Sequence, residues 1–151
     1  MLVLALVIGI VAGLRAMMAP AAIAWAASTG LLPLQGTWLA FFGARYAPWI
    51  FSILAVAELV TDQLPSTPSR KAPAQFGARI ATGGLSGAAI GYGLGAPLFG
   101  LVLGVIGAVV GTLGGARLRA RLAAIFGSDR PAALVEDVIA IGLAVLVVAL
   151  L

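Results

Sequence analysis

The sequence predicts an all-α protein, a polytopic bundle of about five transmembrane helical segments. The first observation is the composition. Of the 151 residues, 62% are hydrophobic and 9% are charged, whereas soluble domains contain roughly 45–50% apolar and 25% charged residues. The second observation is that the apolar residues form runs long enough to cross a bilayer as helices. No polar linker divides these runs, so we expect residues 1–151 to form a single transmembrane domain.

The first segment, residues 2–34, has Arg15 as its only charged residue. A straight membrane-spanning helix needs about 20 residues, so this stretch is too long for one span and short for two. We therefore expect a broken or re-entrant helix. The expected break points are Gly13, Pro20 and Gly30, because membrane helices tolerate glycine and proline where neighbouring groups satisfy the freed backbone.

Two single helices are expected outside the centre of the sequence. The first follows a group of aromatic residues typical of a membrane surface and begins near Pro48. A polar, proline-rich loop, residues 65–71, follows this helix. The second is the last helix, residues 131–151, which begins after an N-cap at Ser128 or Asp129.

The centre of the sequence, residues 80–116, contains no charge over 37 positions. As one helix this stretch would extend about 55 Å at 1.5 Å per residue, roughly twice the hydrocarbon thickness of a bilayer. Two helices of about 77–95 and 98–116 must share it, with a break in the glycine-rich stretch 91–97. The centre therefore predicts a helical hairpin.

Glycines recur at four-residue spacing along this hairpin, so they lie on one face of each helix. Such a ladder forms a groove into which another helix backbone can press. We interpret it as a close-packing surface, either within the hairpin or between protomers. The alternative is that bare backbone lines a permeation path. The ladder comprises Gly83, Gly87, Gly91, Gly95, Gly100, Gly104, Gly107, Gly111 and Gly115.

Lysine and arginine are concentrated in two stretches, residues 65–79 and 117–130. Basic residues accumulate on the cytoplasmic side of membrane proteins, so both stretches are predicted to be cytoplasmic loops and Arg45 to lie on the other side. A first segment that crosses once places the amino terminus inside and the carboxyl terminus outside. A re-entrant hairpin moves only the amino terminus. A solvated face that touches anionic lipid headgroups is assigned to Arg119, Arg121 and Arg130.

Acidic residues occur in two helices where a charge is costly. Glu58 and Asp62 are four residues apart near the end of one helix, and Glu136 and Asp137 lie near the start of the last. Charges at membrane depth cost on the order of 2–3 kcal/mol and mark functional sites, unless they form structural ion pairs or anchor helix ends. The predicted site is a polar cavity that binds a small ion or an anionic solute. It comprises Arg15, Glu58, Asp62, Arg79, Arg117, Glu136 and Asp137.

The chain has no cysteine and no histidine. Disulfides, thiolate nucleophiles, imidazole bases and the commonest zinc ligands are therefore excluded. The net charge of +4 is not accompanied by an aromatic basic face, so we expect no nucleic-acid partner, and we expect no cofactor. Residues 58–69 are similar to a loop of bacterial polyprenyl-diphosphate phosphatases, and that resemblance implies a histidine that this chain lacks.

Several motifs together resemble a bacterial family of small membrane proteins. They are Gly13-Leu14-Arg15, Ala19-Pro20-Ala21, Glu58 to Asp62 with Leu64-Pro65, Pro68 to Arg70, Ala78-Arg79 with Gly83 to Gly87, Gly111-Thr112 and Ala133 to Asp137. On these motifs, which run nearly end to end, the chain resembles the family known as the domain of unknown function DUF4126. The resemblance implies a location in the bacterial inner membrane, and it supplies no activity.

The sequence thus predicts a small multi-pass transporter or channel-like protein of the lipid bilayer and not an enzyme. Five short helices barely enclose a pathway, so we expect a homo-oligomer. The alternative is a non-enzymatic packing or assembly protein whose glycine ladders bind a partner. A lipid-phosphate phosphatase is a third possibility.

Overall fold

The computed structural model describes residues 2–151, which form six α-helices and one 3₁₀ helix, with no strand among them. The all-α fold class is confirmed. The helices are α1 (Leu2–Leu14), α2 (Met18–Ser28), η1 (Ala40–Gly43), α3 (Ala47–Thr61), α4 (Pro73–Gly93), α5 (Pro97–Phe126) and α6 (Asp129–Leu150).

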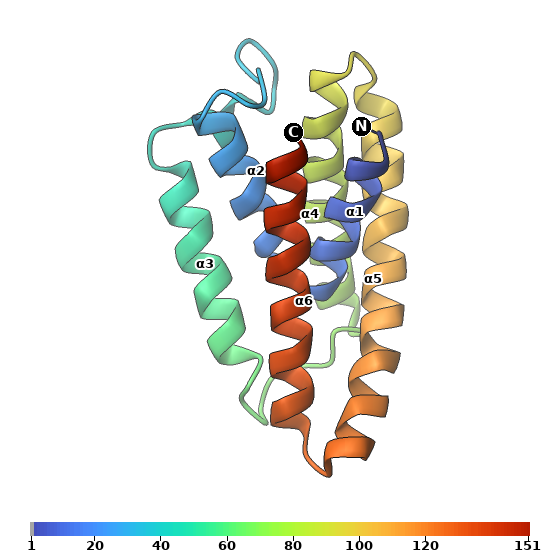
Figure 1. Cartoon of the computed structure of the whole chain (residues 1–151). Coiled ribbons are helices and arrows are strands. Elements are labelled where there is room, and N and C mark those ends of the chain that lie inside the picture. Colours follow the sequence, from blue (N-terminus) through green and yellow to red (C-terminus); the bar gives the residue numbers. More distant parts are fainter. Residues whose placement is uncertain (1) are drawn as a thin grey trace.

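Four helices, α3 to α6, run in alternating directions along the bundle, and α1 and α2 form a shorter hairpin among them (Figure 1). This hairpin enters from the end that carries both chain termini and turns back inside the bundle. The opposite end, called the lower end from here on, carries residues 62–72 and the α5–α6 turn. Within the bundle, α1 packs against α4, α5 and α6.

The break between α1 and α2 lies at residues 15–17, and not at the expected Gly13, Pro20 or Gly30. Gly13 remains in the last turn of α1, where a side chain would collide with the Ala108 carbonyl of α5. Pro20 lies in the first turn of α2, where a missing N–H removes no helical hydrogen bond. Gly30 comes after the end of α2 and adopts a left-handed conformation with φ 83°.

The helix α5 continues to Phe126 and does not end at residue 116 as the sequence predicted. Residues 117–126 are rich in alanine, leucine and arginine, which are strong helix formers, so the helix continues where the apolar run stops. It ends before Gly127, whose φ of 70° is typical of a glycine at a helix C-terminus. The second basic stretch is therefore mostly helix and not a loop.

Glycines bring three helix backbones into direct contact. A Cβ at most of these positions would overlap the facing backbone, so the helices approach more closely than other residues would allow. Gly95 is an exception, because it forms the α4–α5 turn with φ 69°. The ladder therefore packs within one chain. Helices α4 and α5 meet at Gly83, Gly87, Gly91, Gly100 and Gly104, and α5 meets α1 at Gly107, Gly111 and Gly115.

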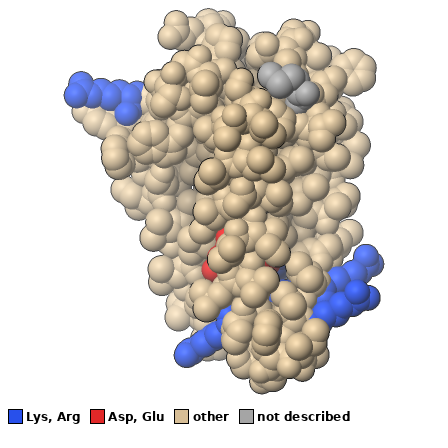
Figure 2. Space-filling view, in the orientation of Figure 1, with Lys and Arg blue, Asp and Glu red and all other residues tan. Residues whose placement is uncertain are grey.

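Two helices, α5 and α6, are long and apolar enough to cross a membrane, judged by length and composition alone. Helices α1, α2 and α3 are apolar but shorter, with 13, 11 and 15 residues. Large apolar side chains such as Ile53, Leu98 and Val138 are exposed on the outside of the bundle. Figure 2 shows basic side chains gathered mainly near the lower end, with a largely uncharged surface above them. An exposed apolar surface of this extent marks contact with a membrane or another protein.

Gly104→Ala is expected to lower the Tm, because the new Cβ would overlap the Gly83 carbonyl, and overpacking of this kind costs about 1–3 kcal/mol. The matched control is Gly114→Ala in the same helix, where nothing lies within 4 Å of the new Cβ. This control should keep or raise the Tm, since alanine favours helix. Thermal unfolding of the purified protein in mild detergent measures both. Equal Tm values for the two variants would contradict the packing.

Candidate functional site

The turn between α1 and α2 leaves backbone polar groups inside the bundle, because the last carbonyls of a helix have no helical partner. Arg79 of α4 satisfies the carbonyls that end α1. Its Nη1 donates to the carbonyl oxygens of Gly13 at 2.8 Å and Leu14 at 2.7 Å. Thr112 of α5 donates a further hydrogen bond to the Gly13 carbonyl at 3.3 Å. A guanidinium at this position also suits the helix dipole, whose negative end lies at the C-terminus.

Glu58 of α3 satisfies the other side of the turn, where α2 begins. Its Oε1 accepts a hydrogen bond from the Ala16 N–H and its Oε2 accepts one from the Met17 N–H, both at 2.8 Å. A carboxylate is favourable at a helix N-terminus, where N–H groups are free and the dipole is positive. Arg79 Nη2 lies 3.5 Å from Glu58 Oε1, so the two side chains that cap the turn also contact each other.

Arg15 lies in the turn itself and is completely buried. Its Nη1 donates to Asp62 Oδ2 at 2.5 Å and its Nε donates to Asp137 Oδ1 at 2.7 Å, while Nη2 also contacts Asp137. The same Nη2 lies 4.0 Å from Glu136 Oε2. A buried guanidinium needs such partners because it has lost its hydration. Arg15 therefore links the turn to the end of α3 and to the third turn of α6.

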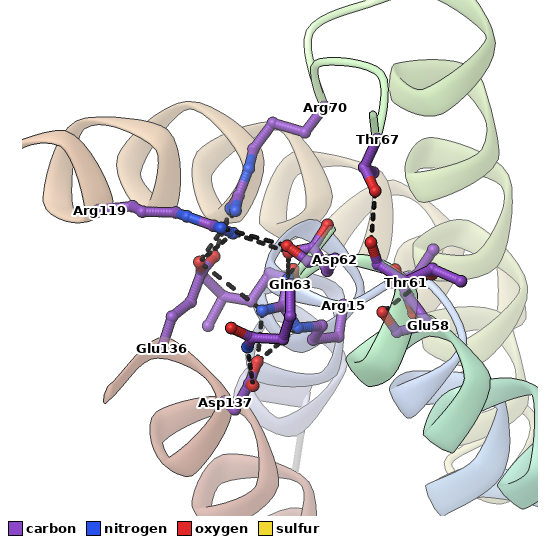
Figure 3. A network of polar contacts seen from close by, with 12 residues as sticks. Arg15, Glu58, Thr61, Asp62, Gln63, Thr67, Arg70, Arg119, Glu136 and Asp137 are labelled. Atoms are coloured by element: carbon purple, nitrogen blue, oxygen red, sulfur yellow. Dashed lines mark hydrogen bonds and ion pairs between the residues drawn. The ribbon is translucent and has the colours of Figure 1, made fainter. Parts of the chain in front are cut away.

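Two arginines outside the predicted set complete this arrangement (Figure 3). Arg70 approaches from the loop at residues 62–72 and forms a two-bond pair with buried Glu136, in which Nη2 lies 2.9 Å from Oε2. Arg119 of α5 donates to Asp62 Oδ2 at 2.7 Å. Its Nε and Nη2 also donate to the two carboxylate oxygens of Asp129, at 2.9 and 2.6 Å. Both arginines thus connect the buried acids to the lower end.

The sequence predicted Arg117 for this place and a solvated face for Arg119, but it is Arg119 that pairs with Asp62, with its side chain only 16% exposed. Arg117 is exposed and makes no ion pair with any described residue. Two residues along an α-helix rotate a side chain by about 200°, so these arginines point in nearly opposite directions. Arg119 lies four residues after Gly115 and continues the glycine face that packs inward, and this spacing could have identified it. The other six predicted binding residues come together: Arg15, Glu58, Asp62, Arg79, Glu136 and Asp137.

These contacts define what we call the charged cluster. It contains four guanidinium groups and four carboxylates, so its formal charges cancel. Asp62, just after the end of α3, belongs to it. Burial raises the pKa of Asp62, but Arg15 and Arg119 outweigh this effect and hold the pKa of that carboxyl below its usual range, so it is ionised at neutral pH. The charged cluster consists of Arg15, Arg70, Arg79, Arg119, Glu58, Asp62, Glu136 and Asp137.

A polar pocket of about 380 Å³ opens beside the charged cluster at the lower end. Arg70 and Arg119 line it together with Asp62, and the loop residues Thr67 and Ser69 also line it. The pocket therefore gives water-soluble molecules access to one side of the cluster. Among residues 2–151, no group of three or more acidic side chains is arranged to hold a metal ion.

No protein-family model, curated protein or solved structure matches the chain. The chemistry of the site therefore has to be argued from its own residues.

Glu58→Ala is expected to accelerate amide hydrogen exchange at Ala16 and Met17, because both N–H groups lose their acceptor. Hydrogen bonds to charged groups contribute about 1.5–3 kcal/mol, so exchange should rise roughly ten- to a hundredfold. Exchange of the protein in detergent, followed by mass spectrometry, measures this change.

The control for this experiment is Asp129→Ala, which removes a carboxylate whose side chain is 62% exposed. Surface ion pairs contribute only about 0–1 kcal/mol, so exchange at the turn should not change. If Glu58→Ala left the exchange of both amides at the wild-type rate, Glu58 would not be the group that caps α2.

Proposed function

We propose that this chain is a multi-pass protein of the bacterial inner membrane, in which α3 to α6 cross the bilayer and α1–α2 is a re-entrant hairpin. The length and apolar character of α5 and α6 support this topology, as does the exposed apolar surface. The concentration of basic residues at the lower end supports a cytoplasmic orientation for that end. Both termini then lie outside. Membership of the DUF4126 family, which would fit this location, stays a prediction from the motifs.

We further propose that the protein is a small transporter or channel-like protein for a small ion or an anionic solute, with the charged cluster as its site. The observation that carries this proposal is the short helical hairpin α1–α2, whose turn holds buried Arg15 among acids from two other regions. Irregular backbone at membrane depth is tolerated only where it is buried in protein or lines a cavity. Broken helices at a polar site are characteristic of transporters.

Shared partners allow the charged cluster to rearrange. Asp62 is bound by both Arg15 and Arg119, and Arg119 is also bound by Asp129. An anion in the polar pocket would meet Arg70 and Arg119 and could replace a carboxylate on either one. The cluster is already neutral, so an added anion leaves a surplus negative charge. A proton or a cation taken up with the anion removes this surplus, and we therefore expect coupled movement.

The packing or assembly alternative receives no support from the glycine ladder, because the ladder is covered within the chain. The phosphatase alternative has a pocket with hydroxyls and arginines in its favour, but each pocket arginine is held by a carboxylate. The expected homo-oligomer stays a prediction.

The proposal predicts that Glu58→Gln and Glu136→Gln each reduce flux by about tenfold or more. A tenfold reduction corresponds to a rise of about 1.4 kcal/mol in the activation free energy of the rate-limiting step. Each change removes one negative charge from a balanced set of buried partners. Flux is measured in liposomes containing the purified protein, with pyranine for protons and with imposed gradients of chloride, phosphate and potassium.

The matched control is Arg45→Gln, an exposed residue just before α3 at the opposite end of the bundle from the charged cluster, which should keep wild-type flux. Size-exclusion profiles and Tm values establish that each variant is folded. Folded amide variants that both retain wild-type flux would refute a transport role for the acids.

A further inference from the structure

A second cavity lies on the side of the bundle. It is an apolar groove of about 540 Å³ between α2, α3 and α6. Its floor contains small residues, including Ala22, Ala55 and Ala144, and its walls include Val56 and Val145. Helix α3 packs on α2 and η1, and the groove occupies the space between α3 and α6. A helix separated from its neighbour by such a groove leaves room for a hydrocarbon chain.

One end of the groove reaches the charged cluster. Met18 and Leu59 line the groove, and they directly follow Met17 and Glu58, which are hydrogen-bonded to each other. Asp62, which lines the polar pocket, is three residues beyond Leu59. Leu59 at the groove and Asp62 at the pocket are therefore about one helical turn apart at the end of α3. Figure 2 shows acidic side chains at a small opening in the face that Figure 1 shows with α3 and α6 in front.

The lower end of the bundle has a surplus of positive charge. Lys71 lines the polar pocket and is exposed, and Arg117, Arg121 and Arg130 are also exposed near that end. The charged cluster is neutral and does not offset these four positive charges. Asp129 is the one acidic residue outside the cluster among the described residues, so it alone opposes them. Basic residues at a membrane surface attract anionic headgroups, at about 1 kcal/mol for each residue.

From this arrangement we infer that the molecule recognised here is an anionic phospholipid. Its hydrocarbon chain lies in the groove between α2, α3 and α6, and its phosphate lies at the pocket beside Lys71 and Arg119. This inference rests on the proposed function, since it names the class of anionic solute. A molecule with a long apolar chain and a charged phosphate can place its chain in the groove and its phosphate at the polar pocket about one helical turn away, whereas a small soluble anion uses only the pocket.

Val145→Trp tests the groove, because an indole at this exposed wall position fills space that the chain would occupy. Leu146→Trp is the matched control, since Leu146 is the next residue of α6, is also exposed and does not line the groove. Native mass spectrometry in mild detergent measures binding of phosphatidylglycerol, with phosphatidylcholine and inorganic phosphate as comparison probes. We expect wild type and Leu146→Trp to retain phosphatidylglycerol in preference to both comparison probes and Val145→Trp to lose most of it.

Lys71→Glu tests the headgroup contact, with Arg45→Glu at the opposite end of the bundle as its control. Lys71→Glu should weaken phosphatidylglycerol binding by about tenfold, and Arg45→Glu should leave it unchanged. Lipid binding that is equal in all four variants, or that does not distinguish phosphatidylglycerol from phosphatidylcholine, would overturn the inference.

Transbilayer movement separates this inference from the proposed function. Liposomes carrying fluorescently labelled phosphatidylglycerol report movement of the lipid when dithionite bleaches the outer leaflet. Lipid movement that is lost in Val145→Trp and in Glu136→Gln supports both proposals. If the flux of a soluble ion is lost in Glu136→Gln but intact in Val145→Trp, and no lipid binds selectively, the transport proposal stands and the inference of a phospholipid ligand is overturned. Selective lipid binding without movement of any probe keeps the lipid site and overturns transport.

Discussion

The α1–α2 turn has backbone carbonyls and N–H groups that must be satisfied away from water, and much of the structure follows from how this is done. Arg79 binds the carbonyls that end α1, and Glu58 binds the N–H groups that begin α2. Each charge also matches the sign of the helix end that it caps. A buried unpaired backbone group costs about as much as a lost hydrogen bond, so neither side chain is free to leave. The turn consequently holds the side chains of Glu58 and Arg79 in place, and with them the positions of α3 and α4 around it.

The glycine contacts make this capping geometrically possible. Arg79 can reach the end of α1 because α1, α4 and α5 lie with their backbones in contact, through residues such as Gly83, Gly104 and Gly107. Larger residues there would move the helices apart and would separate the guanidinium from the carbonyls of the turn. The ladder and the charged cluster are therefore two parts of one arrangement: close backbone packing in the upper part of α5 positions the polar side chains further down.

The sequence was enough to identify charged residues that stand alone in an apolar stretch. It was not enough where membership of the site depends on the direction in which a side chain points from its helix. Arg15 stands alone in a long apolar stretch, and Glu58 and Asp62 share one helix face, so these could be named in advance. The four-residue spacing of Arg119 from Gly115 distinguishes it from Arg117 only if the helix continues past residue 116, where the sequence predicted its end. The end of an apolar run marks where a helix leaves a hydrophobic environment and not where it ends. The break was expected at Gly13 but lies at residues 15–17. A glycine is needed at position 13 because the backbone of α5 lies against it, and the helix does not bend there.

The exposure of the ion pairs increases from Arg15 through Arg119 to Asp129, so the pairs differ in how much free energy is needed to break them. Arg15 is completely buried and holds two carboxylates, whereas Arg119 is partly exposed and shares Asp62 with it. Breaking a buried pair leaves an uncompensated charge at a cost of about 3–5 kcal/mol, but an exposed pair contributes about 0–1 kcal/mol. Exchange in the proposed transporter must therefore begin at Arg119 and its outer partner Asp129. Release of Asp62 by Arg119 then leaves that carboxylate bound to Arg15 alone, so the shared acid is the route by which a change at the pocket reaches the buried turn.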